Sequence, residues 1–305
     1  MTDLERSAFI QILAGTPARL KAALKGVPKK VLLWTPGPGK WSILEIVAHM
    51  RDMERDAYIG RYHRILTEDN PTLPDIDGDL LAQSEDYRGM KLTEVLRDWA
   101  RLRKECLKLV KSVKGARWER IGTHEFAGPL SMDALLRRQA MGNDEAHLEQ
   151  IENIVKRAAL FEALEPSPRK LAELTKKLDD ATLRRKPAPD KWSALEVVCH
   201  LRDVEQRWAE RLVKIAFSER PSFLPFDVNG LARKRRYNEQ DLGAALKEFA
   251  RLREDNLRLL RVVPASQWSR AGVHAKYGEL TIHRIVEMIV SHDRGHFEQI
   301  TRTVS

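Results

Sequence analysis

The stretch GKWSILEIVAHMRDME, residues 39–54, returns later in the chain as DKWSALEVVCHLRDVE, residues 190–205. Trp41 matches Trp192 and His49 matches His200, both at an offset of 151. Further on, DWARLRKECLKLV (98–110) matches EFARLREDNLRLL (248–260) at an offset of 150, and NDEAHLEQI (143–151) matches HDRGHFEQI (292–300) at an offset of 149. Because these landmarks keep their order with only one-residue slips, the chain contains an internal duplication.

Each half of the duplication predicts four long amphipathic helices. In the second half they fall at about 165–180, 191–217, 240–262 and 281–302, where apolar residues recur every three or four positions. Ser42 and Ser193 each stand three residues before a glutamate, which is the capping-box pattern of a helix start. No segment alternates long enough to predict a strand, so we expect strands to be absent or trivial. The sequence therefore predicts an all-α protein of two tandem four-helix bundles.

The boundary between the bundles is expected in ALFEALEPSP (159–168), because residues 16–17 align with 167–168 at the start of each repeat. We therefore expect domains at 1–160 and 161–305. One slip falls in the fourth helix of the first half, which carries one more residue than its counterpart. An extra helical residue would rotate everything after it by about 100°. We expect it to be absorbed at the helix start, around Met132 to Leu135, and a π-bulge is the alternative.

Composition narrows the class of protein. Among 305 residues, 53 Lys and Arg stand against 44 Asp and Glu, for a net charge of +9. These charges are interspersed, as on solvated helix faces, so we do not expect nucleic-acid binding. No run approaches the roughly 18 apolar residues of a membrane span. The first residues include early acidic side chains and no continuous apolar stretch, so we do not expect a secretory signal. We expect a cytoplasmic protein whose two cysteines, Cys106 and Cys199, are buried apolar residues.

Histidines are the strongest candidates for chemistry. His292 and His296 are four residues apart, so a helix would place both on one face. His200 lies on the apolar side of the second helix, which a bundle brings alongside the fourth. Three imidazoles would leave a position open for water or substrate, as in catalytic metal sites, and they suit zinc, nickel, copper or iron. The alternative is a chance pair of histidines on one helix.

Taken together, these motifs resemble the DinB/YfiT-like superfamily, in its DinB-like helical-bundle branch. The matching features are the two stretches quoted first, VHAKYGELTIHRIV (273–286) and the terminal HDRGHFEQI. The resemblance covers both halves and implies up-down-down-up four-helix bundles with a divalent metal, zinc or nickel, on His200, His292 and His296. Characterised enzymes of this family are mostly thiol-dependent S-transferases or isomerases, and many other members are described as metal-dependent hydrolases.

The first half departs from this pattern. His49 and His147 occupy two of the three ligand positions, but the position between them holds Asn143. An amide is a poorer ligand than imidazole for zinc or nickel. We therefore expect the first site to be empty or weakly occupied.

Several further residues are candidates for supporting roles. Asp203 follows His200 by three residues and Gln299 follows His296 by three, so either could fix the tautomer of a ligand imidazole. The alternatives are a salt bridge for Asp203 and a helix-end hydrogen bond for Gln299. We interpret Trp41 and Trp192 as packing anchors. The paired histidines of the segment before the fourth helix, His124 and His274, are interpreted as loop or capping residues, although His274 could line the mouth of the site.

Two classes of function remain open. The first is a metal-dependent enzyme that acts on a small-molecule substrate, either by S-transfer with a low-molecular-weight thiol or by hydrolysis. The second is a non-catalytic metal-binding or scaffold protein. In the second case its bundles would form a covalent pseudo-dimer, and the chain would act as a monomer or as a homodimer. No general base is evident, because Glu205 lies five residues beyond His200 and off its helix face.

Overall fold

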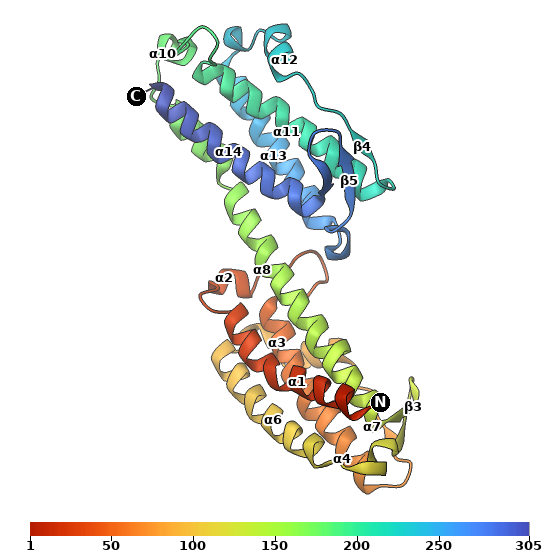
Figure 1. The fold of residues 1–305 in the computed structure, drawn as a ribbon. Helices are drawn as coiled ribbons and strands as arrows, with labels where there is room; N and C mark the ends of the chain where they lie inside the picture. The colour runs from red at the N-terminus through yellow and green to blue at the C-terminus, as the bar shows by residue number, and fades with distance from the viewer. Residues whose placement is uncertain (305) are drawn as a thin grey trace. The chain divides into compact units, whose positions relative to one another are not determined.

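The computed structural model describes residues 1–304 and divides the chain into two compact units (Figure 1). The first unit is Met1–Lys156, and the second begins at Arg157. The division falls within helix α8 (Ala146–Leu164), the helix that also contains residue 160, where we placed the domain boundary. Each unit is a helical bundle, so the all-α fold with two tandem up-down-down-up four-helix bundles is confirmed.

The first unit builds two of its four long helices from several segments. The long helices are α1 (Asp3–Ala23), then α3 (Ile43–Asp52) continued by a π-helical segment (Met53–Ile59) and α4 (Gly60–Thr67), then α6 (Leu92–Ser112), and last α7 (Met132–Arg137) continued by a second π-helical segment (Arg138–Glu145) and α8. Short helices α2 (Lys29–Leu32) and α5 (Gly78–Ser84) lie in the connections.

Both π-helical segments absorb an extra residue that the second unit lacks. The difference in residue number between matching positions of the two units falls from 151 to 150 between Glu54 and the end of α4. It falls again, from 150 to 149, between the start of α7 and Asn143. The expectation that the second slip would be absorbed at the helix start was wrong, because Met132–Arg137 is regular α-helix and the π-helical segment follows it. A π-bulge adds a residue while returning later side chains to the same helix face. Asp144 can therefore still reach its buried partner Arg103.

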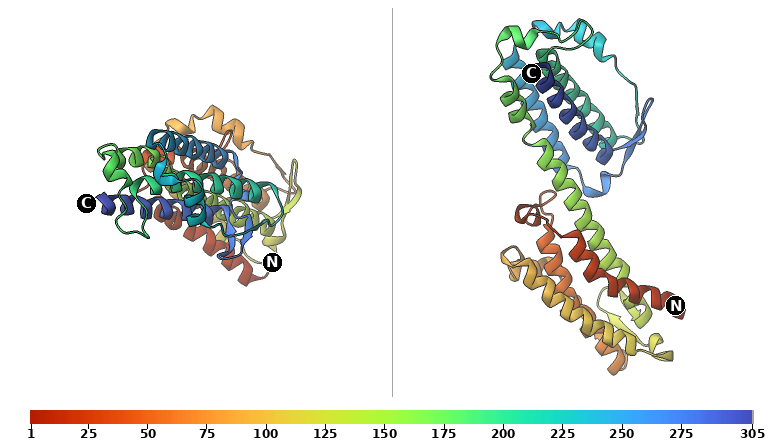
Figure 2. Two further views of the ribbon diagram at one scale, coloured as in Figure 1. Left: turned by 90° about the horizontal axis from the view of Figure 1, so that it is seen from above. Right: turned by 60° about the vertical axis from the view of Figure 1, so that its left-hand side comes forward.

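The second unit has the same order of helices without π-helical segments. Its first helix consists of the end of α8 and α9 (Ser167–Thr175), followed by the short α10 (Asp180–Arg184), α11 (Ala194–Phe217), the short α12 (Val228–Lys234), α13 (Leu242–Val262) and α14 (Ile282–Val304). Helices α11, α13 and α14 pack side by side (Figures 1 and 2). Between α11 and α13 the chain runs back along the bundle through α12, so these two helices point the same way (Figure 1).

The two predicted capping boxes are confirmed. Ser42 accepts a hydrogen bond from the backbone N–H of Glu45, whose side chain accepts one from the Ser42 backbone, and Ser193 and Glu196 do the same at the start of α11. These caps satisfy backbone donors that a helix start otherwise leaves unpaired. They fix the start of each helix that carries His49 or His200, and thus the register of both histidines.

Each unit also holds a small three-stranded sheet that we did not expect. In the first unit β1 (Thr72–Leu73) pairs parallel with β2 (Ile121–His124), which pairs antiparallel with β3 (Gly128–Ser131). The second unit repeats this with β4 (Ser222–Phe223), β5 (Ala271–His274) and β6 (Gly278–Thr281). Strands of two to four residues are too short for alternation to reveal them.

Each unit has its own apolar core. The first is built around residues such as Leu13, Tyr62, Cys106 and Leu135, and the second around residues such as Leu171, Val197, Cys199 and Phe249. Both cysteines are fully buried, as predicted. Among the helices formed by residues 1–304, none has the length and apolar character needed to cross a membrane.

Candidate metal centre

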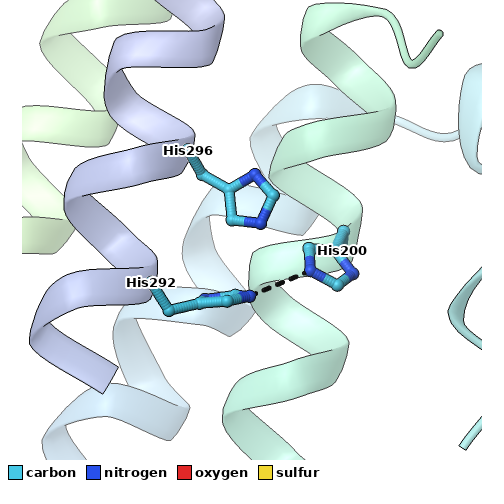
Figure 3. Close-up of side chains that lie close together, drawn as sticks. All are labelled: His200, His292 and His296. Carbon is cyan, nitrogen blue, oxygen red and sulfur yellow. Dashed lines mark hydrogen bonds between the residues drawn. The ribbon is translucent and has the colours of Figure 1, made fainter. Parts of the chain in front are cut away.

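Three histidines of the second unit converge between two neighbouring helices. His200 projects from α11, and His292 and His296 project from α14 on successive turns (Figure 3). One ring nitrogen from each lies within 4.8 Å of the other two. The Nε2 atoms of His200 and His292 are 3.1 Å apart. Two nitrogens bound to one tetrahedral zinc ion at 2.0–2.1 Å would be about 3.3 Å apart, so this pair has the spacing that a shared metal requires.

The outer ring nitrogens, Nδ1, of His296 and His292 differ in their partners. His296 Nδ1 donates a hydrogen bond to Gln299 Oε1 at 2.9 Å, which leaves Nε2 of His296 free of its proton and able to coordinate. Within residues 1–304, His292 Nδ1 is buried without a hydrogen-bond partner, so the burial of this ring is not explained by protein contacts alone. The residues present therefore fit a divalent metal.

Burial keeps these imidazoles neutral. It lowers the pKa of His200 to about 2, with a further contribution from His296 and His292. The pKa of His292 is lowered to about 3 by burial, by His296 and by Arg253. Burial also lowers the pKa of His296. Neutral imidazole is the form that coordinates a metal, so near neutral pH no proton competes for these nitrogens.

Trp192 forms one wall of the site. Its ring centroid lies 4.6 Å from that of His200, and it lies 6.4 Å from His296 with the two rings nearly parallel at 16°. Trp192 is half-buried, so it borders the site on a partly exposed side. Trp192 also packs against the apolar core of the second unit, in agreement with its interpretation as a packing anchor, and its contact with the histidine rings was not expected.

The two supporting candidates behave differently. Gln299 contacts His296, as described above. Asp203 accepts hydrogen bonds from Arg202 and Arg235, both at 2.8 Å, and from the hydroxyl of Tyr237 at 2.6 Å. The sequence left a surface salt bridge open as the alternative for Asp203, and the residue does form ion pairs, but its carboxylate is buried.

A buried ion network lies beside the histidines, and we did not anticipate it from sequence. Arg253 of α13 donates to Glu205 at 2.7 and 2.8 Å and to Asp293 at 2.7 Å, so it links α11 to α14. The Arg253 and Glu205 side chains are at most 2% exposed, and that of Asp293 is 7% exposed. The first unit repeats the network with Arg103, Glu54 and Asp144. The network could have been found from the aligned repeats, because its arginine, glutamate and aspartate are identical in the two halves.

The first unit brings together the counterparts of the three histidines, but only two of these residues are histidines. The ring centroids of His49 and His147 are 5.1 Å apart, and His147 Nδ1 is 3.1 Å from Gln150 Oε1, as in the second unit. Asn143 is buried and donates to Asp144 at 3.1 Å. A Cβ atom on Gly78 would lie 2.6 Å from His49 Cε1, so the start of α5 lies directly against this imidazole.

His124 and His274 accept hydrogen bonds from the turns of the two antiparallel hairpins, β2–β3 and β5–β6. His124 Nδ1 accepts hydrogen bonds from the backbone N–H groups of Phe126 and Ala127, and His274 Nδ1 accepts them from the following turn in the same way. Both imidazoles therefore cap the turns between the antiparallel strands, in agreement with the capping interpretation.

Comparison with known proteins places the chain among helical bundles. The family model of the DinB superfamily matches residues 12–151 and 163–300. Among solved structures, the chain is similar to YfiT from Bacillus subtilis, described as "a probable metal-dependent hydrolase with an unusual four-helix bundle topology". The sequence identity is 20% and the TM-score 0.49, and the match covers 52% of this chain and 90% of YfiT. A search of curated proteins found no match.

Proposed function

The chain belongs to the DinB superfamily, as its motifs predicted, and we propose that its second unit is the metal centre of a metal-dependent enzyme. In this proposal His200, His292 and His296 bind one divalent transition metal, zinc or nickel. The convergence of their ring nitrogens within 4.8 Å is the observation that carries it. The proposed substrate is a small molecule, and the proposed reaction is S-transfer from a low-molecular-weight thiol.

The protein's own residues prepare the site for this role. The three imidazoles are kept neutral by burial, Gln299 fixes the tautomer of His296, and Trp192 provides an apolar wall. When bound, a divalent metal supplies a Lewis acid that lowers the pKa of a coordinated thiol or water. With three protein ligands, one position stays open for that group.

The surroundings of the site favour a thiol over water as the nucleophile. Hydrolysis usually uses a carboxylate or imidazole as general base, and Glu205 and Asp293 are two buried carboxylates on the helices that carry the histidines. Both are buried and tied to Arg253 by ion pairs, so neither is available to accept a proton. A thiol has an ordinary pKa of about 8.5, far closer to neutrality than that of water, so a metal needs to lower its pKa much less to make it a nucleophile.

The first unit has a structural role in this proposal. Asn143 replaces a ligand, and its side-chain amide donates a hydrogen bond to Asp144. The start of α5 also lies against Cε1 and Nδ1 of His49, at Gly78, whereas the matching position in the second unit holds Val228. One working centre per chain is therefore proposed.

Cobalt substitution tests the proposal directly. The full-length protein is stripped of metal, loaded with Co²⁺ and titrated with glutathione or 2-mercaptoethanol. We expect new near-ultraviolet absorption from a thiolate bound to cobalt, and its loss in His296→Ala. A spectrum that thiols leave unchanged contradicts S-transfer. A spectrum that changes only with pH near neutrality favours hydrolysis instead.

A further inference from the structure

A groove on the second unit lies on a different face of α14 from the one that carries the histidines. It has a volume of about 770 Å³ and runs between α14 and the segment formed by the end of α8 and α9. Its apolar lining comes from Ala163, Leu174, Val290 and Phe297, and Lys170 and Arg294 also line it. A volume of this size is typical of sites that bind small molecules.

The matching place in the first unit is a smaller groove, of about 400 Å³, and an ion pair bridges its helices. There Arg19 of α1 binds Glu145 through two hydrogen bonds, one of them 3.0 Å long. The residues aligned with this pair are Lys170 and Arg294, so the second unit has two cations where the first has a cation and an anion. Like charges cannot bridge the helices, and the groove is open.

Two cations of the groove have no ion-pair partner within the second unit. Among residues 1–304, neither Lys170 nor Arg294 forms an ion pair with an acidic side chain. The lining holds a third cation, Arg302, and three acids. Of these acids, Asp293 is paired with Arg253 and Glu173 with Arg169 at 3.6 Å, and Glu298 is the third. An anion between Lys170 and Arg294 would therefore give these two cations a partner that the protein does not supply.

We propose that this groove binds a small amphipathic carboxylate, with its carboxylate between Lys170 and Arg294 and its hydrocarbon chain along Leu174, Val290 and Phe297. The ligand carboxylate would supply the negative charge that Glu145 supplies in the first unit. Charge-assisted hydrogen bonds to lysine and arginine would hold it, and burial of the chain would add affinity.

Calorimetric titration with decanoate tests the proposal on the full-length protein. We expect one binding event per chain that weakens about 10- to 100-fold in Arg294→Glu, because that change recreates the ion pair of the first unit with Lys170. The variant is expected to fold, since the first unit already carries this arrangement. Arg101→Glu makes the same change of charge on an exposed residue of the first unit and should leave decanoate binding unchanged.

Two further measurements separate this groove from the metal centre. Decanoate should bind equally well before and after the metal is removed, because the proposed contacts do not involve the histidines. Decyltrimethylammonium, which has the same chain and the opposite charge, should bind at least tenfold more weakly than decanoate. Undetectable decanoate binding, equal binding to Arg294→Glu, dependence on the metal, or equal affinity for the ammonium compound would each overturn the proposal.

Discussion

Gln299 is the residue that orients a proposed ligand, because its side-chain oxygen accepts the Nδ1 proton of His296. Replacing it by leucine should weaken metal binding by about 10- to 100-fold, as the loss of such a partner does in other metal sites. Competition with a chromophoric chelator measures this affinity. Gln150→Leu removes the corresponding contact to His147 in the first unit and should leave the affinity unchanged. Equal losses in the two variants would contradict the assignment of the metal to the second unit.

The buried histidines make the stability of the metal-free protein depend on pH. The pKa values of His49, His200 and His292 fall to about 4, 2 and 3 in the folded state, below the ordinary value near 6.5. Below pH 6.5 the unfolded chain therefore binds protons that the folded chain excludes, and the free energy of unfolding falls as the pH falls. Each histidine should contribute on the order of 2 kcal/mol between pH 7 and pH 5.

Urea denaturation of the chelator-treated protein at pH 7, 6 and 5 measures this dependence. His200→Gln removes one of the titrating groups, so its stability should change less steeply with pH than that of the parent chain. If the two proteins show the same slope, burial of His200 is not the cause.

The sequence supports some of these residue assignments better than others. The four-residue spacing of His292 and His296 and the duplicate position of His200 pointed to the three histidines, because helix geometry converts spacing into proximity. The choice between Gln299 and Asp203 could not be made from sequence, since both follow a histidine by three residues. Asp203 differs because Arg202, Arg235 and Tyr237 occupy its carboxylate, and two of these lie more than thirty residues away.

At the scale of elements, the π-helical segment of the fourth helix should tolerate loss of its extra residue. Deleting the half-exposed Met141 should convert Arg138–Glu145 to α-helix and cost about 1–2 kcal/mol of the free energy of unfolding. Circular dichroism and urea denaturation measure the outcome.

The matched deletion in the second unit provides the contrast. Ser291 is an exposed residue of the unbroken helix α14, and its removal would rotate the rest of the helix by about 100°. We expect a loss of more than about 4 kcal/mol, together with loss of metal binding. Similar costs for the two deletions would mean that the π-helical segment does not hold the extra residue.

The buried arginines tie the bundle helices together. Arg253→Met leaves the carboxylates of Glu205 and Asp293 buried without their cation and should destabilise the second unit by about 3–5 kcal/mol. Arg251→Met is the control, since its side chain is 55% exposed and its ion pairs are on the surface. That change should cost less than about 1 kcal/mol. Chemical denaturation measures both variants, and equal stability of the two would contradict a structural role for the network.

At the scale of the whole molecule, the duplication determined how much could be predicted. Two copies of each motif identified the helices and their order, because a pattern that occurs twice is not a local accident. The sequence did not reveal how the copies differ in detail, since the π-helical segments and the contact of Gly78 with His49 depend on tertiary packing. The sheets were missed because their strands are only two to four residues long, and because the parallel pairs join residues about fifty positions apart.

Elemental analysis of the purified, untagged protein tests the central claim, one metal centre in the second unit. We expect about one equivalent of zinc or nickel per chain, lost in His292→Ala and retained in His147→Ala, with the circular dichroism of both variants unchanged. Two equivalents in the parent chain would show that Asn143 does not disable the first site. No metal in the parent chain and none taken up on reconstitution, or metal retained by His292→Ala, would contradict the account.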